Sequence, residues 1–134
     1  MELNKALLTG DISSIDFDLE IDRDRYAQTT ILKASPRCKV YYCFKNDDTR
    51  EDGEDRCSID TFNEICHSLA KVLSENTLQG TPSLKYSLII TTTDKTKYSF
   101  NNEGLSSHTI KAIINILSNH IDEYTFLAAF THFI

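Results

Sequence analysis

The sequence is poor in glycine, and its four glycines stand far apart at positions 10, 53, 80 and 104. Loops that bind nucleotides need several glycines close together, so that backbone amides can approach a phosphate group. The serine-hydrolase motif G-x-S-x-G is missing as well. These absences exclude a P-loop, a dinucleotide-binding fingerprint and that type of hydrolase.

Long apolar runs are also missing, and the closest is FLAAF at residues 126–130. A membrane-spanning helix needs about 18 or more consecutive apolar residues. The first ten residues, MELNKALLTG, hold one lysine and an acidic residue at position 2. They contain no apolar run of about seven residues, which a signal peptide requires. We therefore expect neither a signal peptide nor a membrane span, and no membrane partner.

The four cysteines, at positions 38, 43, 57 and 66, are even in number and would allow two disulfides. Disulfide frameworks are typical of small exported domains. This chain has 134 residues and no expected export signal. We interpret the cysteines as reduced thiols and expect a cytoplasmic protein.

Positive charge is scarce relative to negative charge: 14 Lys and Arg stand against 20 Asp and Glu, for a formal net charge of −6. Because phosphate binding relies on Lys and Arg, this balance disfavours nucleic acid as a partner. It favours a basic protein partner, or it serves solubility alone. The length fits one domain over residues 1–134.

Motifs for metal binding and catalysis are missing too. No C-x-x-C or H-x-x-x-H pair occurs. The acidic loop around Gly53 fails as a calcium loop because Arg50 and Ile59 fall where oxygen ligands are required. Cys66 and His67 cannot act as a nucleophile and its base, because neighbours on a helix point about 100° apart. We expect Cys66 in the core, His67 at the surface, and no catalytic residue, metal or cofactor.

The clearest strand in the sequence, residues 14–22, alternates apolar residues with carboxylates. The apolar residues of one face are Ile15, Phe17, Leu19 and Ile21. The acids of the other face are Asp16, Asp18, Glu20 and Asp22. Since successive side chains of a strand point to opposite faces, the pattern predicts one face on a core and one in water.

Further strands are predicted at residues 26–34 and 38–44, and in a hairpin over residues 84–100 with its turn near Asp94-Lys95. Residues 46–56, NDDTREDGEDR, contain no apolar side chain. They predict a solvated loop or hairpin tip that turns at Asp52-Gly53.

Two helices are predicted. The first begins at an N-cap Ser58 and runs to about Glu75, and the second begins at Ser106 or Ser107 and bends near residues 120–122. This order of elements predicts an α+β fold, with an antiparallel sheet of about five strands and two helices packed on one face.

The alternating acids allow three interpretations. They can form the wet face of a half-buried strand and discourage aggregation at the sheet edge. They can form a docking surface for a basic protein, together with the acids of residues 46–56. They can imitate the phosphates of a nucleic acid, although nearby arginines interrupt them. The candidate partner-binding residues are Asp16, Asp18, Glu20, Asp22, Asp47, Asp48, Glu51, Asp52, Glu54 and Asp55.

Residues 84–117, LKYSLIITTTDKTKYSFNNEGLSSHTIKAIINIL, form a strand-turn-strand-helix unit. This unit resembles half of the small bacterial inhibitor and immunity proteins. The resemblance implies an antiparallel sheet with helices, and acids that neutralise a basic toxin or enzyme. It covers about a quarter of the chain and transfers no functional residue.

These observations predict a non-catalytic acidic binding protein that acts as an immunity or inhibitor protein against a basic toxin or enzyme. One alternative is a structural or regulatory module that forms a homodimer through its apolar C-terminal segment, with Phe126, Phe130 and Phe133. Another is an enzyme of unrecognised type that uses the thiols or the scattered histidines.

Overall fold

The computed structural model describes residues 2–76, 85–101 and 104–121. Within them, six strands form one antiparallel sheet in the order β4-β3-β2-β1-β5-β6. The strands are β1 (Ile12–Asp22), β2 (Arg25–Leu32), β3 (Cys38–Asn46), β4 (Thr49–Cys57), β5 (Lys85–Thr92) and β6 (Lys97–Asn101). The helices are α1 (Leu3–Thr9), α2 (Ile59–Ser74) and α3 (Ser107–His120). The predicted α+β class is confirmed, with six strands in place of about five.

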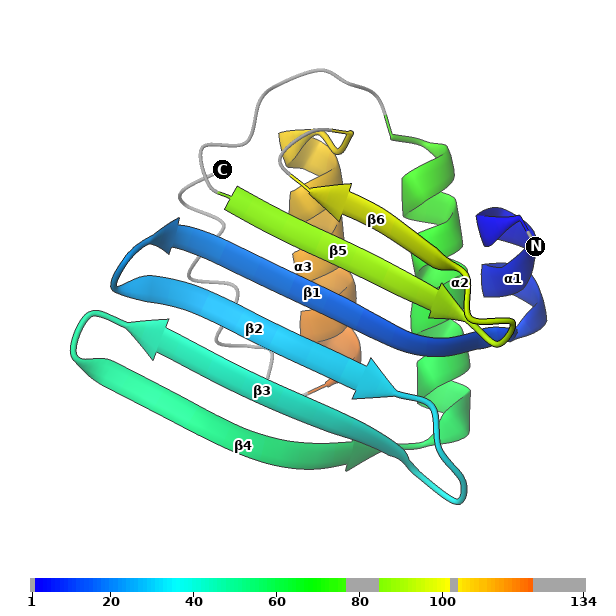
Figure 1. Ribbon diagram of the computed structural model, residues 1–134, viewed down its shortest axis with the longest axis horizontal. Coiled ribbons are helices and arrows are strands. Elements are labelled where there is room, and N and C mark those ends of the chain that lie inside the picture. The colour runs from blue at the N-terminus through cyan, green and yellow to red at the C-terminus, as the bar shows by residue number, and fades with distance from the viewer. Residues whose placement is uncertain (1, 77–84, 102–103, 122–134) are drawn as a thin grey trace.

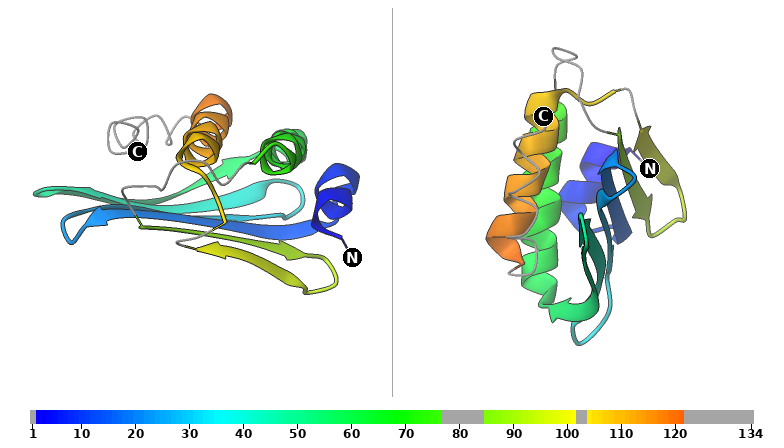
Figure 2. Two further views of the ribbon diagram at one scale, coloured as in Figure 1. Left: turned by 90° about the horizontal axis from the view of Figure 1, so that it is seen from above. Right: turned by 90° about the vertical axis from the view of Figure 1, so that its left-hand side faces the viewer.

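The helices gather on one side of the sheet. Helices α2 and α3 lie side by side over one face, and α1 packs beside α2 (Figures 1 and 2). We call this face the covered face. No helix of the described residues lies on the opposite face, which we call the open face.

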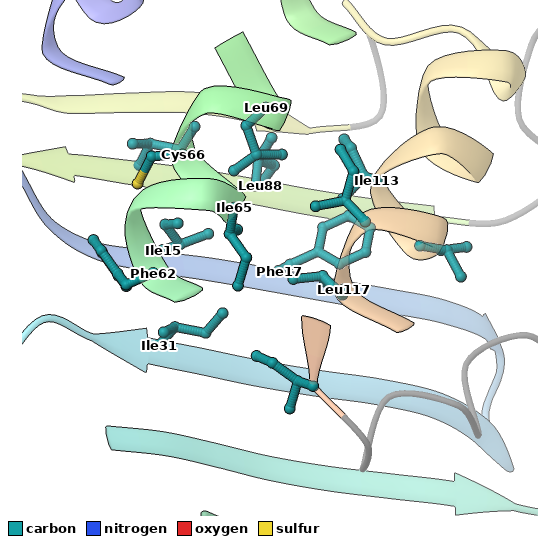
Figure 3. Close-up of a cluster of buried hydrophobic side chains, with 14 of the residues drawn as sticks. Ile15, Phe17, Ile31, Phe62, Ile65, Cys66, Leu69, Leu88, Ile113 and Leu117 are labelled. Atoms are coloured by element: carbon teal, nitrogen blue, oxygen red, sulfur yellow. The ribbon is translucent and has the colours of Figure 1, made fainter. Parts of the chain in front are cut away.

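The core lies between the middle strands and the two long helices, as Figure 3 shows. Its labelled side chains come from three strands and both helices: Ile15, Phe17, Ile31, Leu88, Phe62, Ile65, Cys66, Leu69, Ile113 and Leu117. Each of these side chains is at most 2% exposed. Burying one large apolar side chain stabilises the fold by about 1.5–3 kcal/mol. The apolar stripes predicted for β1 and α2 therefore supply much of the core.

Both long helices begin at the serines predicted to cap them. The Ser58 hydroxyl accepts a hydrogen bond from the Thr61 amide at 3.0 Å, and the Ser106 hydroxyl accepts one from the Thr109 amide at 3.2 Å. Such caps satisfy backbone donors that the first turn of a helix leaves free. Helix α3 ends at His120, and Ile121 adopts extended backbone angles. The predicted bend near residues 120–122 and any continuation of the helix reach beyond the described residues.

Helix α1 has only seven residues and is not predicted from the sequence. Ala6 and Leu7 are buried, and contact with α2 holds the helix in place. Gly10 ends it at φ 81°, a left-handed conformation that glycine adopts without steric strain. Within the described part of the chain, no helix has the length and apolar character needed to cross a membrane.

One predicted element is wrong: residues 46–56 are not a solvated loop. Residues 49–57 form the edge strand β4, and the hairpin turns at Asp47 and Asp48 rather than at Asp52-Gly53. An edge strand is held by backbone hydrogen bonds to one neighbour, and its charges discourage pairing with other chains. It therefore needs no apolar stripe, which is why hydrophobic periodicity does not reveal it. Gly53 lies opposite Tyr42, whose side chain fills the space that a Cβ would need.

Candidate functional site

The open face carries three acids of β1. Because side chains alternate along a strand, burial of its apolar residues on the covered face directs Asp16, Asp18 and Glu20 to the open face. We call these three residues the β1 carboxylates. Asp16 and Asp18 are half-buried, and Glu20 is exposed. The predicted division of this strand into an apolar and an acidic face is confirmed.

The register of the sheet places specific side chains beside the β1 carboxylates, since residues directly opposite each other share a face. Across β1, β2, β3 and β4, one row consists of Asp16, Thr30, Tyr41 and Glu54. The next row consists of Asp18, Gln28, Cys43 and Asp52. Neighbouring strands are about 4.8 Å apart, so the acids at the two ends of each row are separated by about 14 Å. Neutral polar and aromatic residues fill the space between them.

A shallow depression of about 510 Å³ lies over these two rows. Its lining includes Asp16 and Asp18 from β1 and Tyr41 from β3. The Tyr41 side chain is accessible, because 38% of the residue's surface is exposed. Other lining residues are Gln28, Thr30, Cys43 and Ile89. The depression thus combines two acids, an accessible aromatic ring and several hydrogen-bonding groups.

Asp16 and Asp18 differ in how the fold holds them. Asp16 accepts a 2.7 Å hydrogen bond from the Thr30 hydroxyl, whereas Asp18 accepts a longer bond, 3.4 Å, from the Thr29 amide. Burial raises the pKa of Asp18, the bond from the Thr29 amide opposes that rise, and the negative charge of Asp16 adds to it. The ionised form of Asp18 is therefore disfavoured in the free protein, and a cation placed beside the carboxylate would stabilise that form.

The chain does not supply that cation from its described residues, where no lysine or arginine forms an ion pair with either carboxylate in the depression. Other acids are compensated. Asp22 pairs with Arg25 at 2.5 Å, and this bond lowers the pKa of Asp22. Asp52 pairs with Arg50 at 2.8 Å, and this bond lowers the pKa of Asp52. Glu20 and Glu54 on the same face also form no ion pair with a described residue, but they are exposed, whereas Asp16 and Asp18 are half-buried.

The ten acids predicted as docking residues do not lie on one surface. Asp52 and Glu54 alternate along β4 with Glu51 and Asp55, so the two pairs point to opposite sides of the sheet. Asp47 and Asp48 form the turn between β3 and β4, and Asp22 lies beyond a register shift at the end of β1. The acids that share the open face are Asp16, Asp18, Glu20, Asp52 and Glu54.

The neutral side chains of the depression are the part that sequence reasoning missed. The turn at residues 23–24 pairs Asp22 with Arg25, and counting back from it would place Ile31 opposite Asp16. A register shift between Glu20 and Asp22 moves the pairing by one residue, so Thr30 takes that position, and the turn alone does not reveal it. The connection from β2 to β3 spans residues 33–37 and allows no such count, so nothing in the sequence places Tyr41 beside Asp16.

The thiols and histidines offer a weaker case for chemistry. Cys66 is buried and His67 is exposed, with the His67 ring Nε2 lying 3.2 Å from the Leu8 carbonyl oxygen, so both predicted placements are confirmed. His120 lies 3.4 Å from the exposed carboxylate of Glu64. Across residues 2–76, 85–101 and 104–121, no three His, Cys, Asp or Glu side chains are grouped as a metal site requires.

A second hollow, of about 400 Å³, lies where α1, the end of α2 and β6 meet. Its lining is mainly apolar and includes Leu3, Leu7, Leu73, Phe100 and Leu105. Glu2 supplies the one charge in that lining. Such a hollow could hold an apolar group, but it brings no pair of reactive side chains together.

Comparisons of the chain with protein-family models, curated proteins and solved structures found no match. The resemblance of residues 84–117 to inhibitor and immunity proteins stays a prediction. The apolar segment with Phe126, Phe130 and Phe133, predicted to form a homodimer, lies outside the described residues.

Proposed function

We propose that the protein is a non-catalytic binding protein of the immunity or inhibitor type, and that its open face binds and neutralises a basic toxin or enzyme. The observation that carries the proposal is the pair Asp16 and Asp18, half-buried in a depression and without an ion-pair partner among the described residues. An unpaired charge that is partly removed from water is unfavourable. A cationic group of a partner that pairs with these two carboxylates would offset that cost.

An arginine side chain of the partner fits this depression best. Alternate residues on a strand are about 6.7 Å apart, and the five N–H donors of a planar guanidinium can reach carboxylates on both sides of it. The exposed ring of Tyr41 lies in the same depression, and a cation over an aromatic ring gains about 0.5–2 kcal/mol. The Thr30 hydroxyl holds the Asp16 carboxylate in place while it accepts those donors.

The borders of the acidic rows restrict which partner fits. On one side lies a row with Lys45 and Arg50, and on the other side a row with Lys39 and Arg56. Lys45 pairs with Asp24 and Arg50 with Asp52, so Lys39 and Arg56 are the cations that would repel a surface that is positively charged over its whole width. The open face therefore favours a partner with a compact basic group, such as the cationic centre of an active site. A bound chain that covers such a centre would block the enzyme.

The test starts with the protein encoded beside this gene and with other basic proteins that the wild-type chain retains from its own cell extract. Their affinity is compared for the wild type, the double variant Asp16→Asn/Asp18→Asn and the control Glu51→Gln. The control removes one charge of the same sign from the other side of the same sheet.

The double variant is expected to bind about 100-fold more weakly, since removing one side of a desolvated charge pair costs about 2–5 kcal/mol. The control is expected to bind like the wild type, and the purified partner is expected to lose its activity at an equimolar ratio. Equal binding of the double variant would overturn the role of the depression. Binding without loss of activity would overturn the inhibitor function.

A further inference from the structure

Two of the four cysteines face each other at one end of the sheet. In the register of β3 with β4, Cys38 lies directly opposite Cys57. Directly opposite residues of antiparallel strands have Cα atoms about 4.5–5.5 Å apart, and disulfides span Cα separations of about 4.4–6.8 Å. The backbone therefore already has a spacing that a disulfide accepts.

The two thiols also lie on the same face of the sheet. Opposite residues share a face of the sheet, and both side chains are buried, Cys38 at 0% and Cys57 at 7% exposed. The Cys38 sulfur helps to raise the pKa of the Cys57 thiol, which indicates that the two are close, and the Cys38 thiol donates to the Ala34 carbonyl oxygen at 3.8 Å. Both thiols are free in the structure.

We propose that Cys38 and Cys57 form a reversible disulfide that links the edge strand β4 to β3 when the protein meets an oxidising low-molecular-weight disulfide such as oxidised glutathione. The Cys57 thiolate attacks one sulfur of the reagent, which forms a mixed disulfide and releases one glutathione thiolate. The Cys38 thiolate then attacks the Cys57 sulfur and releases the second glutathione. Two electrons pass from the protein thiols to glutathione, and their two protons leave with them.

A route from solvent leads to Cys57. The residue lines a polar depression of about 230 Å³ together with Arg37, Asp55, Arg56 and His120. The two arginines outnumber the one carboxylate of this lining, which favours an anionic reagent such as glutathione. Cys57 is therefore the thiol that meets the reagent first, and the fully buried Cys38 resolves the mixed disulfide.

The reaction is expected to be slow at neutral pH. Burial is the largest cause that raises the pKa of Cys57 to about 11; the sulfur of Cys38 and the carboxylate of Asp55 contribute to the rise, and Arg37 opposes it. Because the thiolate is the attacking species, the rate should rise about tenfold per pH unit well below that pKa. The pair thus responds to sustained oxidation and not to a brief pulse.

Cys66 is the competing partner within the core. It also lies near Cys38, but it comes from α2, outside the strand register, and burial raises its pKa to about 12. The experiment must therefore identify which cysteines are joined. The structure assigns the bond to Cys57, because Cys57 alone stands opposite Cys38 in the described sheet.

The full-length protein is incubated in slightly alkaline buffer with a series of oxidised to reduced glutathione ratios. Free thiols are then alkylated in denaturant and the peptides are mapped by mass spectrometry, with circular dichroism recorded before denaturation. The wild type is expected to fall from four free thiols to two, with a peptide that joins Cys38 to Cys57 and an unchanged circular dichroism spectrum.

The double variant Cys43→Ser/Cys66→Ala is expected to form the same bond, and Cys38→Ala to form none within the chain. The bond should also raise the midpoint temperature of thermal unfolding of the wild type, because it reduces the number of conformations that the unfolded chain can adopt. Four free thiols at the most oxidising ratio, a bond from Cys38 to Cys66, or a bond that forms only after the spectrum is lost would each overturn the proposal.

Discussion

Strand β1 contributes to both faces of the sheet, and the two faces differ in how the chain compensates each side chain. Phe17 is 2% exposed and is surrounded by apolar side chains from α2, α3 and neighbouring strands (Figure 3). Asp16 and Asp18, its neighbours in sequence, are half-buried and gain two hydrogen bonds but no ion pair with a described residue. On the covered face the described chain packs each apolar side chain of β1, whereas on the open face Asp16 and Asp18 have no counterion among the described residues.

Acids of strand β4 provide a second comparison, because they carry the same charge as the acids of β1 but differ in ion pairing. Asp52 pairs with Arg50 two residues away, so its charge is compensated on its own strand. Asp18 lies in the same row of the open face and has no such neighbour. Acids on one face of the sheet therefore differ in how far the chain compensates them, and the proposed site is the half-buried pair without an ion pair among the described residues.

The largest expected difference between the faces is in stability. Replacing Phe17 with Ala should lower the free energy of unfolding by about 3–5 kcal/mol, because it leaves a cavity in a packed core. Replacing the adjacent Asp16 with Ala should change it by about 1 kcal/mol or less. Urea unfolding of both variants measures the difference. Similar losses for the two variants would contradict the division of β1 into a structural and a binding face.

The same comparison can be made on the edge strand. Gly53→Ala should destabilise the protein by about 1–3 kcal/mol, because the new Cβ displaces the Tyr42 side chain. Glu54→Ala, one residue along and on the other face, should stay within about 0.5 kcal/mol of the wild type. Thermal and urea unfolding would measure the difference in stability between the two variants. Equal stability would mean that Tyr42 does not pack against Gly53.

The affinity for the basic partner should depend on the acid that has no counterion among the described residues, and less on acids that are already paired. Asp18→Asn should weaken binding of the basic partner by about 10-fold to 100-fold. The double variant Arg50→Gln/Asp52→Asn, which removes a compensated pair, should change affinity less than about fivefold. Calorimetric titrations at low and high salt measure both. A stronger effect of the paired residues would place the binding surface on β4.

The smallest expected effect is a gain in stability when Asp18 is replaced by Asn. Since the folded-state pKa of Asp18 is raised, its ionisation destabilises the fold once the pH exceeds the unfolded value of 3.8. Asp18→Asn should therefore be slightly more stable than the wild type at neutral pH, and this advantage should disappear as the pH falls below that value. Thermal unfolding across this pH range measures it. A variant that is less stable at neutral pH would show that Asp18 is already compensated.

Much of the fold follows from local patterns in the sequence. The alternation in β1, the capping serine and apolar stripe of α2, and the turn near Asp94-Lys95 each predict an element that the structure contains. Strand β4 and helix α1 escape prediction because neither owes its structure to apolar periodicity. One is held by backbone pairing with β3, and the other by contact with α2.

The sequence alone determined which side of β1 is apolar and which is acidic, because a period of two residues leaves no other arrangement on a strand. Only the tertiary structure decided which side chains stand beside those acids. The register across three strands brings Tyr41 and Thr30 to Asp16, and no lysine or arginine of the described residues forms an ion pair with Asp18. Whether a cation from elsewhere in the sequence reaches Asp18 depends on distances that exist only in the folded chain.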